Sequence, residues 1–459
     1  MTRVLVVPPI AHGLVGRTDL PIPAWLFGWG AAVVLVISFV ALAVLWPKPR
    51  LEGAPERRVL KLPAWLEIPC GLLGVALFAL VVYAGLQGAQ AATANLAPTF
   101  VYVAFWVGLL PLQVLFGDVF ALFNPWRALG RAAGWVSGRV AGDSLPEPMA
   151  YPPWLGRWPA AIGILCFAWL ELVSTSRSDP STIAILALVY AAIQLVGMSL
   201  YGVRQWERRG DAFAVYFGLF ARLSPLRWER GTLYVRPLLS GVTTLTPVPG
   251  TVALLTTMIG TTTFDGFSNG PLWSDIAPEI TDVITDLGVG QATALQIAFT
   301  LGLLVVVGLV ALLYRFGVAG MRTVAPERDT GELARTFVHT LTPIALAYAV
   351  AHYFSLLVYQ GQALAYLASN PLGHTLAEGD NGWLGTASWG VDYTVVGART
   401  IWYVQVGALV LGHVAGLVLA HDRALKVFDR PREATRSQYW MLVVMVAFTS
   451  LGLWLLSAR

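Results

Sequence analysis

Two carboxylates and one imidazole lie inside apolar stretches of this sequence, where little water is available to solvate a charge. Glu171 occurs in "AWLELVS", Asp265 in "TTTFDGFS" and His352 in "AVAHYFSLLVYQGQ". An ionisable group in such a stretch costs free energy and indicates a functional site by default. Together the three side chains can bind a divalent metal ion, activate water or move protons. We therefore take Asp265, Glu171 and His352 as candidate catalytic residues and candidate ligands of a divalent metal cofactor.

Polar neighbours supply candidate substrate-binding groups for a small molecule or ion. These are Thr261, Thr262, Thr263, Gln360 and Gln362. The alternative for the threonines is that their hydroxyls donate to carbonyls of their own helix. The alternative for Glu171 is a rim carboxylate that is solvated or paired with Arg177. The alternative for His352 is an interior histidine bonded to a neighbouring helix.

The composition indicates where these groups must be held. Hydrophobic residues make up 56% of the chain and charged residues only 12%. A soluble domain carries about 25% charged residues, so this chain cannot build a surface that faces water throughout. It predicts an all-α integral membrane protein whose partner is the lipid bilayer. Nucleic acid is not an expected partner, because the basic residues serve to orient the chain in the membrane.

Apolar segments near the roughly 20 residues that cross a bilayer recur along the chain. They predict ten transmembrane helices in a single bundle over residues 25–456, preceded by an external segment, 1–24. The predicted spans are 25–46, 68–85, 100–116, 158–173, 182–202, 238–263, 292–314, 337–359, 401–419 and 439–456.

The loops between these spans alternate in charge. Of the 30 Lys and Arg residues, 25 follow the first, third, fifth, seventh or ninth span. The positive-inside rule places those loops in the cytoplasm. The pattern predicts a multi-pass protein of the plasma membrane with both termini extracytoplasmic.

A short motif occurs twice in the predicted cytoplasmic loops. Gly117–Asp118 in "FGDVFALFNPWR" and Gly210–Asp211 in "RGDAFAVYFGLFAR" are 93 positions apart. We expect each aspartate to cap a helix at the cytoplasmic interface. The motifs predict a tandem parallel repeat of spans 3–4 and spans 5–6. With one inserted residue the same offset aligns Glu171 with Asp265, so the repeat predicts a paired acidic site between its copies.

The sixth predicted span has the composition of a binding segment. Pro247, Pro249 and Gly250 interrupt it, and threonines are frequent along it. Interrupted, hydroxyl-rich spans commonly line sites in membrane bundles. This feature favours a site close to Asp265.

The remaining histidines of the apolar segments have less specific surroundings. His339, His413 and His421 are predicted to be structural or interfacial. Gly412 and Gly416 form a small-xxx-small pair that favours close packing of two helices.

Two external segments carry further candidate features. The loop "SDIAPEITDVITDLG" places Asp275, Glu279, Asp282 and Asp286 on one face of a helix. That face is either a solvated surface or an attractor of cations.

Near the N-terminus, cleavage of a signal peptide before His12 would leave an amine and an imidazole suited to copper. The alternative is an external segment that is not cleaved.

Several stretches resemble one family of actinobacterial multi-pass membrane proteins. They are "AHGLVGRTDLPIPAWLF" (11–27), "TTTFDGFS" (261–268), "AHYFSLLVYQGQ" (351–362) and "TIWYVQVGALVLGHVAGLVLAHDRAL" (400–425). The family bears the name fenitrothion hydrolase, which implies hydrolysis of organophosphate triesters. On that resemblance, Asp265 and Glu171 would hold a metal or activate water, and His352 would act as ligand or general base.

A transporter or channel for a metal ion, proton or small solute is the alternative to a hydrolase. A transporter or channel is consistent with the predicted repeat, the interrupted sixth span and the sparse intramembrane acids. No phosphate-binding P-loop or HExxH motif occurs. Their absence argues against an ATP-driven pump and against the common zinc hydrolases.

Overall fold

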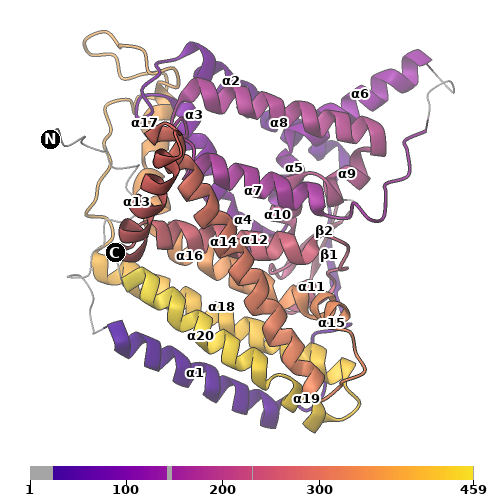
Figure 1. Cartoon of the computed structure of the whole chain (residues 1–459). Coiled ribbons are helices and arrows are strands. Elements are labelled where there is room, and N and C mark those ends of the chain that lie inside the picture. The colour runs from indigo at the N-terminus through magenta and orange to yellow at the C-terminus, as the bar shows by residue number, and fades with distance from the viewer. Residues whose placement is uncertain (1–23, 142–146, 230, 458–459) are drawn as a thin grey trace.

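The computed structural model describes residues 24–141, 147–229 and 231–457. The predicted external segment, including His12, lies outside these ranges apart from its last residue. The chain forms a helical bundle (Figure 1). The helices of its first half are α1 (Ala24–Leu45), η2 (Ala64–Leu66), α2 (Glu67–Gln87), α3 (Leu96–Thr99), the π-helix η3 (Phe100–Val107), α4 (Leu109–Phe116), α5 (Val119–Phe123), α6 (Pro125–Ala141), α7 (Trp158–Leu172), α8 (Pro180–Tyr201), α9 (Val203–Arg209) and α10 (Ala212–Ala221).

The second half continues the bundle. Its helices are α11 (Ser240–Thr243), α12 (Thr251–Ser268), α13 (Pro271–Asp286), α14 (Gln291–Ala319), η5 (Gly320–Thr323), α15 (Thr330–Phe337), η6 (Val338–Thr340), α16 (Leu341–Gln360), α17 (Ala363–Ser369), α18 (Ala398–Val427), α19 (Pro431–Ser437) and α20 (Tyr439–Ser457). A small antiparallel sheet of β1 (Arg57–Lys61), β2 (Leu226–Glu229) and β3 (Thr232–Val235) has the strand order β1-β3-β2.

Eight helical segments in the described ranges are long and apolar enough to cross a membrane. They comprise α1, α2, α3 to α4, α8, α14 with η5, α15 to α16, α18, and α19 to α20. These segments support the predicted class of membrane protein. The other two predicted spans correspond to α7, which has 15 residues, and to α12, which has 18 residues but many threonines. Ten spans, and the orientation of the termini, therefore stay predictions.

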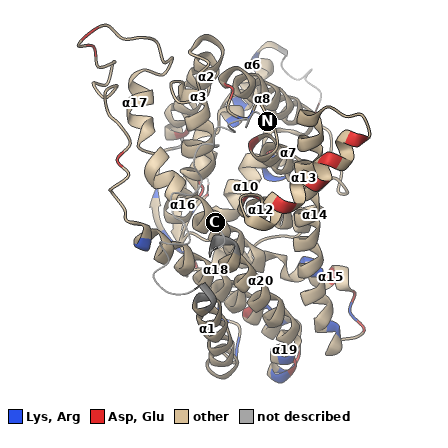
Figure 2. Ribbon diagram, turned by 60° about the vertical axis from the view of Figure 1, so that its left-hand side comes forward, with Lys and Arg blue, Asp and Glu red and all other residues tan. Residues whose placement is uncertain are grey.

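The two ends of the bundle differ in charge. The sheet, α9, α15 and α19 lie toward one end and carry many of the Lys and Arg residues; we call it the basic end (Figures 1 and 2). At the opposite end, which we call the acidic end, the helix α13 exposes Asp275, Glu279, Asp282 and Asp286 (Figure 2). The predicted acidic helix is confirmed, and its acids are exposed. Trp273, Ala277 and Thr281 form its buried face.

The repeated Gly–Asp motif begins a helix at both of its occurrences. The Asp118 carboxylate accepts the backbone N–H of Ala121 at the start of α5. The Asp211 carboxylate likewise accepts the N–H of Ala214 at the start of α10. The prediction that both aspartates cap helices is confirmed.

The second of these helices does not lie at an interface. Most residues of α10 are buried inside the bundle, since its sequence is apolar on every side. By contrast, α6 leaves Trp135, Val136 and Val140 exposed. The expectation of two equivalent interfacial helices is thus wrong for α10.

The sixth predicted span, 238–263, also differs in its limits. The short helix α11 comes first, and a non-helical turn through Pro247, Pro249 and Gly250 separates it from α12. Gly250 has a φ of +80°, which favours glycine and ends the turn. Because α12 continues to Ser268, Asp265 lies within the helix rather than beyond its end.

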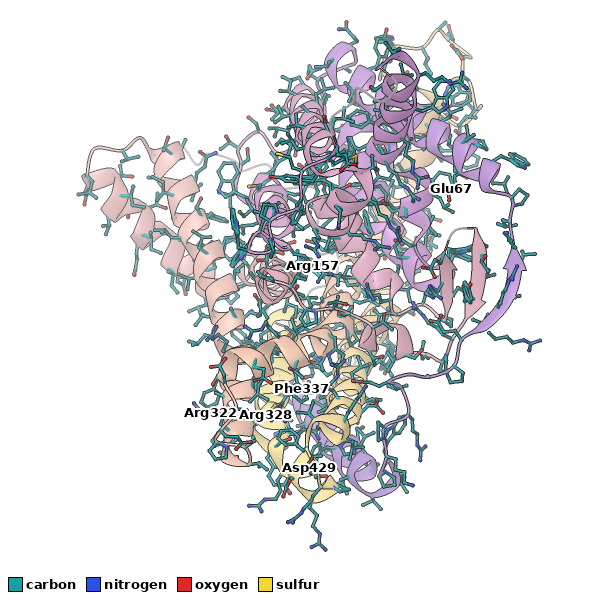
Figure 3. All side chains as sticks on the ribbon, turned by 90° about the vertical axis from the view of Figure 1, so that its right-hand side faces the viewer. Glu67, Arg157, Arg322, Arg328, Phe337 and Asp429 are labelled. Atoms are coloured by element: carbon teal, nitrogen blue, oxygen red, sulfur yellow. The ribbon has the colours of Figure 1, made fainter. Side chains whose placement is uncertain are left out.

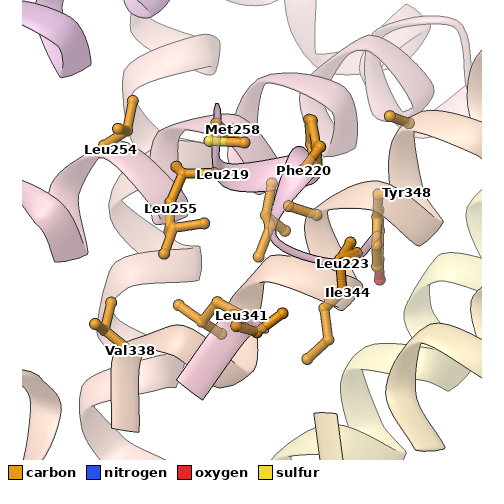
Figure 4. Packing of buried hydrophobic residues seen from close by; sticks show 14 of the residues in the cluster. Leu219, Phe220, Leu223, Leu254, Leu255, Met258, Val338, Leu341, Ile344 and Tyr348 are labelled. Atoms are coloured by element: carbon orange, nitrogen blue, oxygen red, sulfur yellow. The ribbon is translucent and has the colours of Figure 1, made fainter. Parts of the chain in front are cut away.

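The core is formed where three helices meet. Buried apolar side chains of α10, α12 and α16 pack against one another (Figure 4). Labelled from these helices are Leu219 and Phe220 of α10, Leu254, Leu255 and Met258 of α12, and Leu341, Ile344 and Tyr348 of α16, with Leu223 after α10 and Val338 in η6. This packing fixes α12 and α16, the two helices that carry Asp265 and His352.

The helices α16 and α18 approach each other at two glycines. A Cβ atom at Gly412 would lie 2.2 Å from the Cβ of Ala347 and 2.8 Å from the carbonyl oxygen of Pro343. At Gly416 it would lie 3.1 Å from Ile344. The predicted small-xxx-small packing is confirmed.

We predict that Gly412→Ala destabilises the bundle by roughly 1–3 kcal/mol, because the added methyl group overpacks the α16–α18 contact. Gly407→Ala, on the same helix, is the matched control, since nothing lies within 4 Å of its Cβ position. Thermal unfolding in detergent micelles measures both variants. Equal melting temperatures for the two would contradict the prediction.

Candidate functional site

The helices α7 and α12 are joined where they begin. The backbone N–H of Arg157 donates to the carbonyl oxygen of Pro249 over 2.7 Å. The Arg157 guanidinium, which lies inside the bundle (Figure 3), donates to the carbonyl of Thr246 and to the hydroxyl of Thr251. Glu171 and Asp265 lie similar numbers of residues after the first residues of α7 and α12. In each helix this separation corresponds to about 20 Å of helical rise. The two acids are thereby brought to a similar depth.

Asp265 is bound to α16 by two hydrogen bonds. Its Oδ2 lies 2.6 Å from Nε2 of His352, and the hydroxyl of Tyr353 donates to the same oxygen over 3.1 Å. Asp265 and His352 are 2% and 4% exposed, so almost no water solvates this contact. Two adjacent residues of one helix therefore hold a carboxylate that belongs to another.

The second oxygen of Asp265 also has a donor. Asn269, four residues further along the chain, donates its side-chain N–H to Oδ1 over 3.2 Å and to the backbone carbonyl of Asp265 over 2.7 Å. The carboxylate is thus oriented from both sides. A carboxylate held in this way can in turn orient an imidazole and stabilise its protonated form.

Glu171 is buried beside this pair. Its side chain is 7% exposed and interacts electrostatically with Asp265 and with Arg177. In the part of the chain that the structure covers, its Oε1 atom has no hydrogen-bond partner. Arg177, the alternative partner, makes no salt bridge to Glu171 within 4 Å among the described side chains. A buried acceptor without a donor is costly, which marks Glu171 as the member of the cluster free to take up a proton or a ligand.

Aromatic side chains enclose the cluster. Trp106 of η3 stacks on Tyr216 of α10 with ring centroids 4.5 Å apart. Tyr216 and Tyr102 both interact electrostatically with Glu171, and Tyr353 interacts with both acids. π-helices are rare and often occur at functional sites. Five helices, η3, α7, α10, α12 and α16, thus contribute to one site.

Sequence reasoning missed the aromatic part of this site. Tyr353 directly follows His352 and could have been found by that proximity. Trp106, Tyr102 and Tyr216 lie in apolar segments where aromatic residues are ordinary, so nothing in the sequence distinguished them.

The charges of the cluster do not balance by themselves. With both acids ionised and the imidazole neutral, the site would carry two negative charges within the bundle. Mutual repulsion and the loss of water make that state expensive. A proton, a cation or the electrostatic interaction of Glu171 with Arg177 must compensate that charge. Changing its proton content is the chemistry it can perform most readily.

Four of the five predicted substrate-binding residues make hydrogen bonds within the protein. The hydroxyls of Thr261 and Thr262 donate to the carbonyl of Met258, and that of Thr263 to the carbonyl of Ile259. Thus the alternative for the threonines, hydrogen bonds to their own helix, is the one observed.

The two glutamines lie toward the end of α16 and beyond it. Gln362 donates to the carbonyls of Val358 and Asp392 and accepts the N–H of Asp392. It therefore supports the loop after α17. Gln360 is half-buried at the last position of α16.

A three-ligand metal site does not form from the predicted trio. Across residues 24–141, 147–229 and 231–457, no group of three or more His, Cys, Asp or Glu side chains is placed to hold a metal ion. Asp265 and His352 provide two such groups in contact. The arrangement suits proton exchange better than tight binding of a divalent metal, which requires three or four protein ligands.

Comparison with protein-family models, with curated proteins and with solved structures gives no match. The resemblance to the fenitrothion hydrolase family accordingly stays a prediction. What the site can do follows from its own geometry.

We predict that Asp265 and His352 are energetically coupled. Replacing either alone, as in Asp265→Asn or His352→Gln, should cost on the order of 3–5 kcal/mol, because the remaining group is buried with its charge uncompensated. The double variant should cost clearly less than the sum. Free energies of unfolding from detergent titrations measure this cycle.

The control cycle combines His352→Gln with Asp282→Asn. Asp282 is exposed on α13 and has no part in the cluster, so its effect should be additive. Additive costs for Asp265→Asn and His352→Gln would show that the pair contributes no coupling.

Proposed function

We propose that this chain is a proton-translocating membrane protein of the secondary-transporter class, in which Asp265, His352 and Glu171 carry the proton. The observation that supports it most directly is the 2.6 Å contact between Asp265 and His352 deep in the bundle. Chains of Asp, Glu and His within membrane helices are typical of proton relays.

The neighbourhood of Glu171 supports a relay rather than a static ion pair. Asp265 and His352 satisfy each other, whereas the Oε1 atom of Glu171 lacks a hydrogen-bond donor among the described residues. A proton on Glu171 relieves the repulsion between the two acids. Transfer of that proton to the Asp265–His352 pair would shift charge from α7 to α12 and α16.

The spacing of the helices favours a duplicated unit around the site. The first residues of α5 and α10, Val119 and Ala212, are 93 positions apart, and so are those of α7 and α12, Trp158 and Thr251. Each unit then contributes one acid near the end of its second helix. Sites between repeated units are typical of secondary transporters.

The acidic end favours entry of cations, protons included. The helix α13 begins six residues after Asp265 and exposes four carboxylates at that end of the bundle. Such a surface raises the local concentration of cations near the mouth of a site. On the predicted orientation this entry is extracytoplasmic.

Proton flux tests the proposal. Purified protein in liposomes that contain a pH-sensitive dye should admit protons faster than protein-free liposomes when valinomycin sets an inside-negative potential. Glu171→Gln and Asp265→Asn should lower the flux at least tenfold, because an amide cannot exchange the proton.

The exposed acid Asp282 provides the control, and Asp282→Asn should retain the wild-type rate within a factor of about two, as expected for a screened surface charge. Wild-type flux no greater than that of empty liposomes would exclude the proposal. Undiminished flux in Asp265→Asn would exclude this cluster as the path.

A phosphotriester hydrolase is the second candidate. Contact between a carboxylate and an imidazole is the arrangement that orients a histidine as a general base. In such a reaction, His352 would take a proton from water while the water oxygen forms a bond to phosphorus. The bond from phosphorus to the aryl oxygen would break, releasing a phenolate. The family resemblance is the reason to test this chemistry.

Turnover of fenitrothion by the detergent-purified protein tests this candidate through the absorbance of the released nitrophenolate. A hydrolase should lose at least a hundredfold in rate in His352→Gln, the loss of a general base being worth about 10²–10⁴. Asp282→Asn should leave the rate unchanged. No turnover above buffer, or equal turnover in His352→Gln, would reject the hydrolase.

A further inference from the structure

A separate cavity shares the helices α12 and α16 with the Asp265–His352 site. Its volume is about 50 Å³, enough for a few waters or one small ion. Helices α12, α14, η6, α16, α18 and α20 line it, mostly with apolar side chains. Leu341 and Ile344 of its wall belong to the core shown in Figure 4. Neither Asp265, His352 nor Glu171 lines this cavity.

One residue of the cavity wall, His413, has a ring nitrogen without a hydrogen-bond partner among the described residues. Its side chain is fully buried, and its Nδ1 lies 2.8 Å from the carbonyl oxygen of Leu409. A carbonyl oxygen only accepts hydrogen bonds, so Nδ1 carries the proton and Nε2 has a free lone pair. Within the described ranges, Nε2 has no hydrogen-bond partner. Since Nδ1 faces the carbonyl of its own helix, Nε2 is the ring nitrogen directed away from α18.

The hydroxyl groups of the cavity wall are directed elsewhere. The hydroxyl of Tyr314 donates to the carbonyl of Ala334 over 2.7 Å, and that of Thr340 to the carbonyl of Phe337 over 2.8 Å. Neither proton is available to His413. The lone pair on Nε2 therefore receives no hydrogen bond from these two hydroxyls.

Two methionines complete the set of donor atoms. Met441 and Met445 lie one helical turn apart on α20, both 5% exposed, and both line the cavity. Their thioethers are soft, uncharged ligands. The cavity wall contains no carboxylate and no cysteine.

We propose that His413, Met441 and Met445 bind a soft monovalent metal ion, Cu(I). Thioether and imidazole donors select Cu(I) among the biological metals. A single positive charge spread over three neutral ligands costs less to bury than a divalent ion, which would require carboxylates or thiolates. The site uses none of the residues of the proposed proton path, so either proposal can fail without the other.

Competition with a coloured Cu(I) chelator under anaerobic conditions tests the site. Detergent-purified protein with His12→Ala, which removes the N-terminal copper candidate, should bind one Cu(I) per chain. His413→Leu should lower the affinity at least tenfold. Met441→Leu and Met445→Leu, which conserve volume, should each lower it severalfold and lose a sulfur signal in X-ray absorption spectra.

Met321→Leu is the matched control, because Met321 is equally buried but does not line the cavity. It should bind Cu(I) like the parent chain. The melting temperature of His413→Leu shows whether a lower affinity comes from the lost ligand or from a lost fold. The two methionine variants test the site independently of His413. No stoichiometric binding, or unchanged affinity in both methionine variants, would overturn the proposal.

Discussion

A carboxylate inside an apolar bundle has little water to solvate it, and the structure around Asp265 follows from that constraint. Every hydrogen bond that water would have supplied must come from the protein. His352 and Tyr353 supply donors from α16. Asn269, the C-cap residue of α12, supplies another. The position of α16 relative to α12 is therefore set by polar contacts as well as by the apolar core that both helices share.

The same constraint separates two kinds of polar site within one bundle. Around Glu171 and Asp265 the unbalanced charge makes proton exchange the natural chemistry. Around His413 the donors are neutral and soft, so the cavity suits an ion that is weakly hydrated and polarisable. The helix α16 contributes to both sites and packs closely on α18 at Gly412.

Parts of the fold follow from local sequence. Apolar segments of about 20 residues predict membrane helices, and eight of them have the required length and apolarity in the described ranges. The caps at Asp118 and Asp211 and the glycine contact at Gly412 also follow from short motifs. The limits of α12 and the burial of α10 do not. They depend on which helices surround each segment, and hydropathy along the chain does not report that.

The sequence by itself determined which residues are costly in a membrane: Glu171, Asp265 and His352 stand out because their neighbours are apolar. Only the tertiary structure decided which partners they have. Asp265 meets His352 across 87 positions of chain, and Trp106 and Tyr216 join them from apolar segments in which aromatic residues are ordinary. Tertiary structure also directed the threonine hydroxyls to their own helix and left Nε2 of His413, a residue of the cavity wall, without a hydrogen-bond partner among the described residues. The physical reason is that hydrophobicity is a property of each segment, whereas hydrogen bonds and charge compensation are properties of pairs that packing alone brings together.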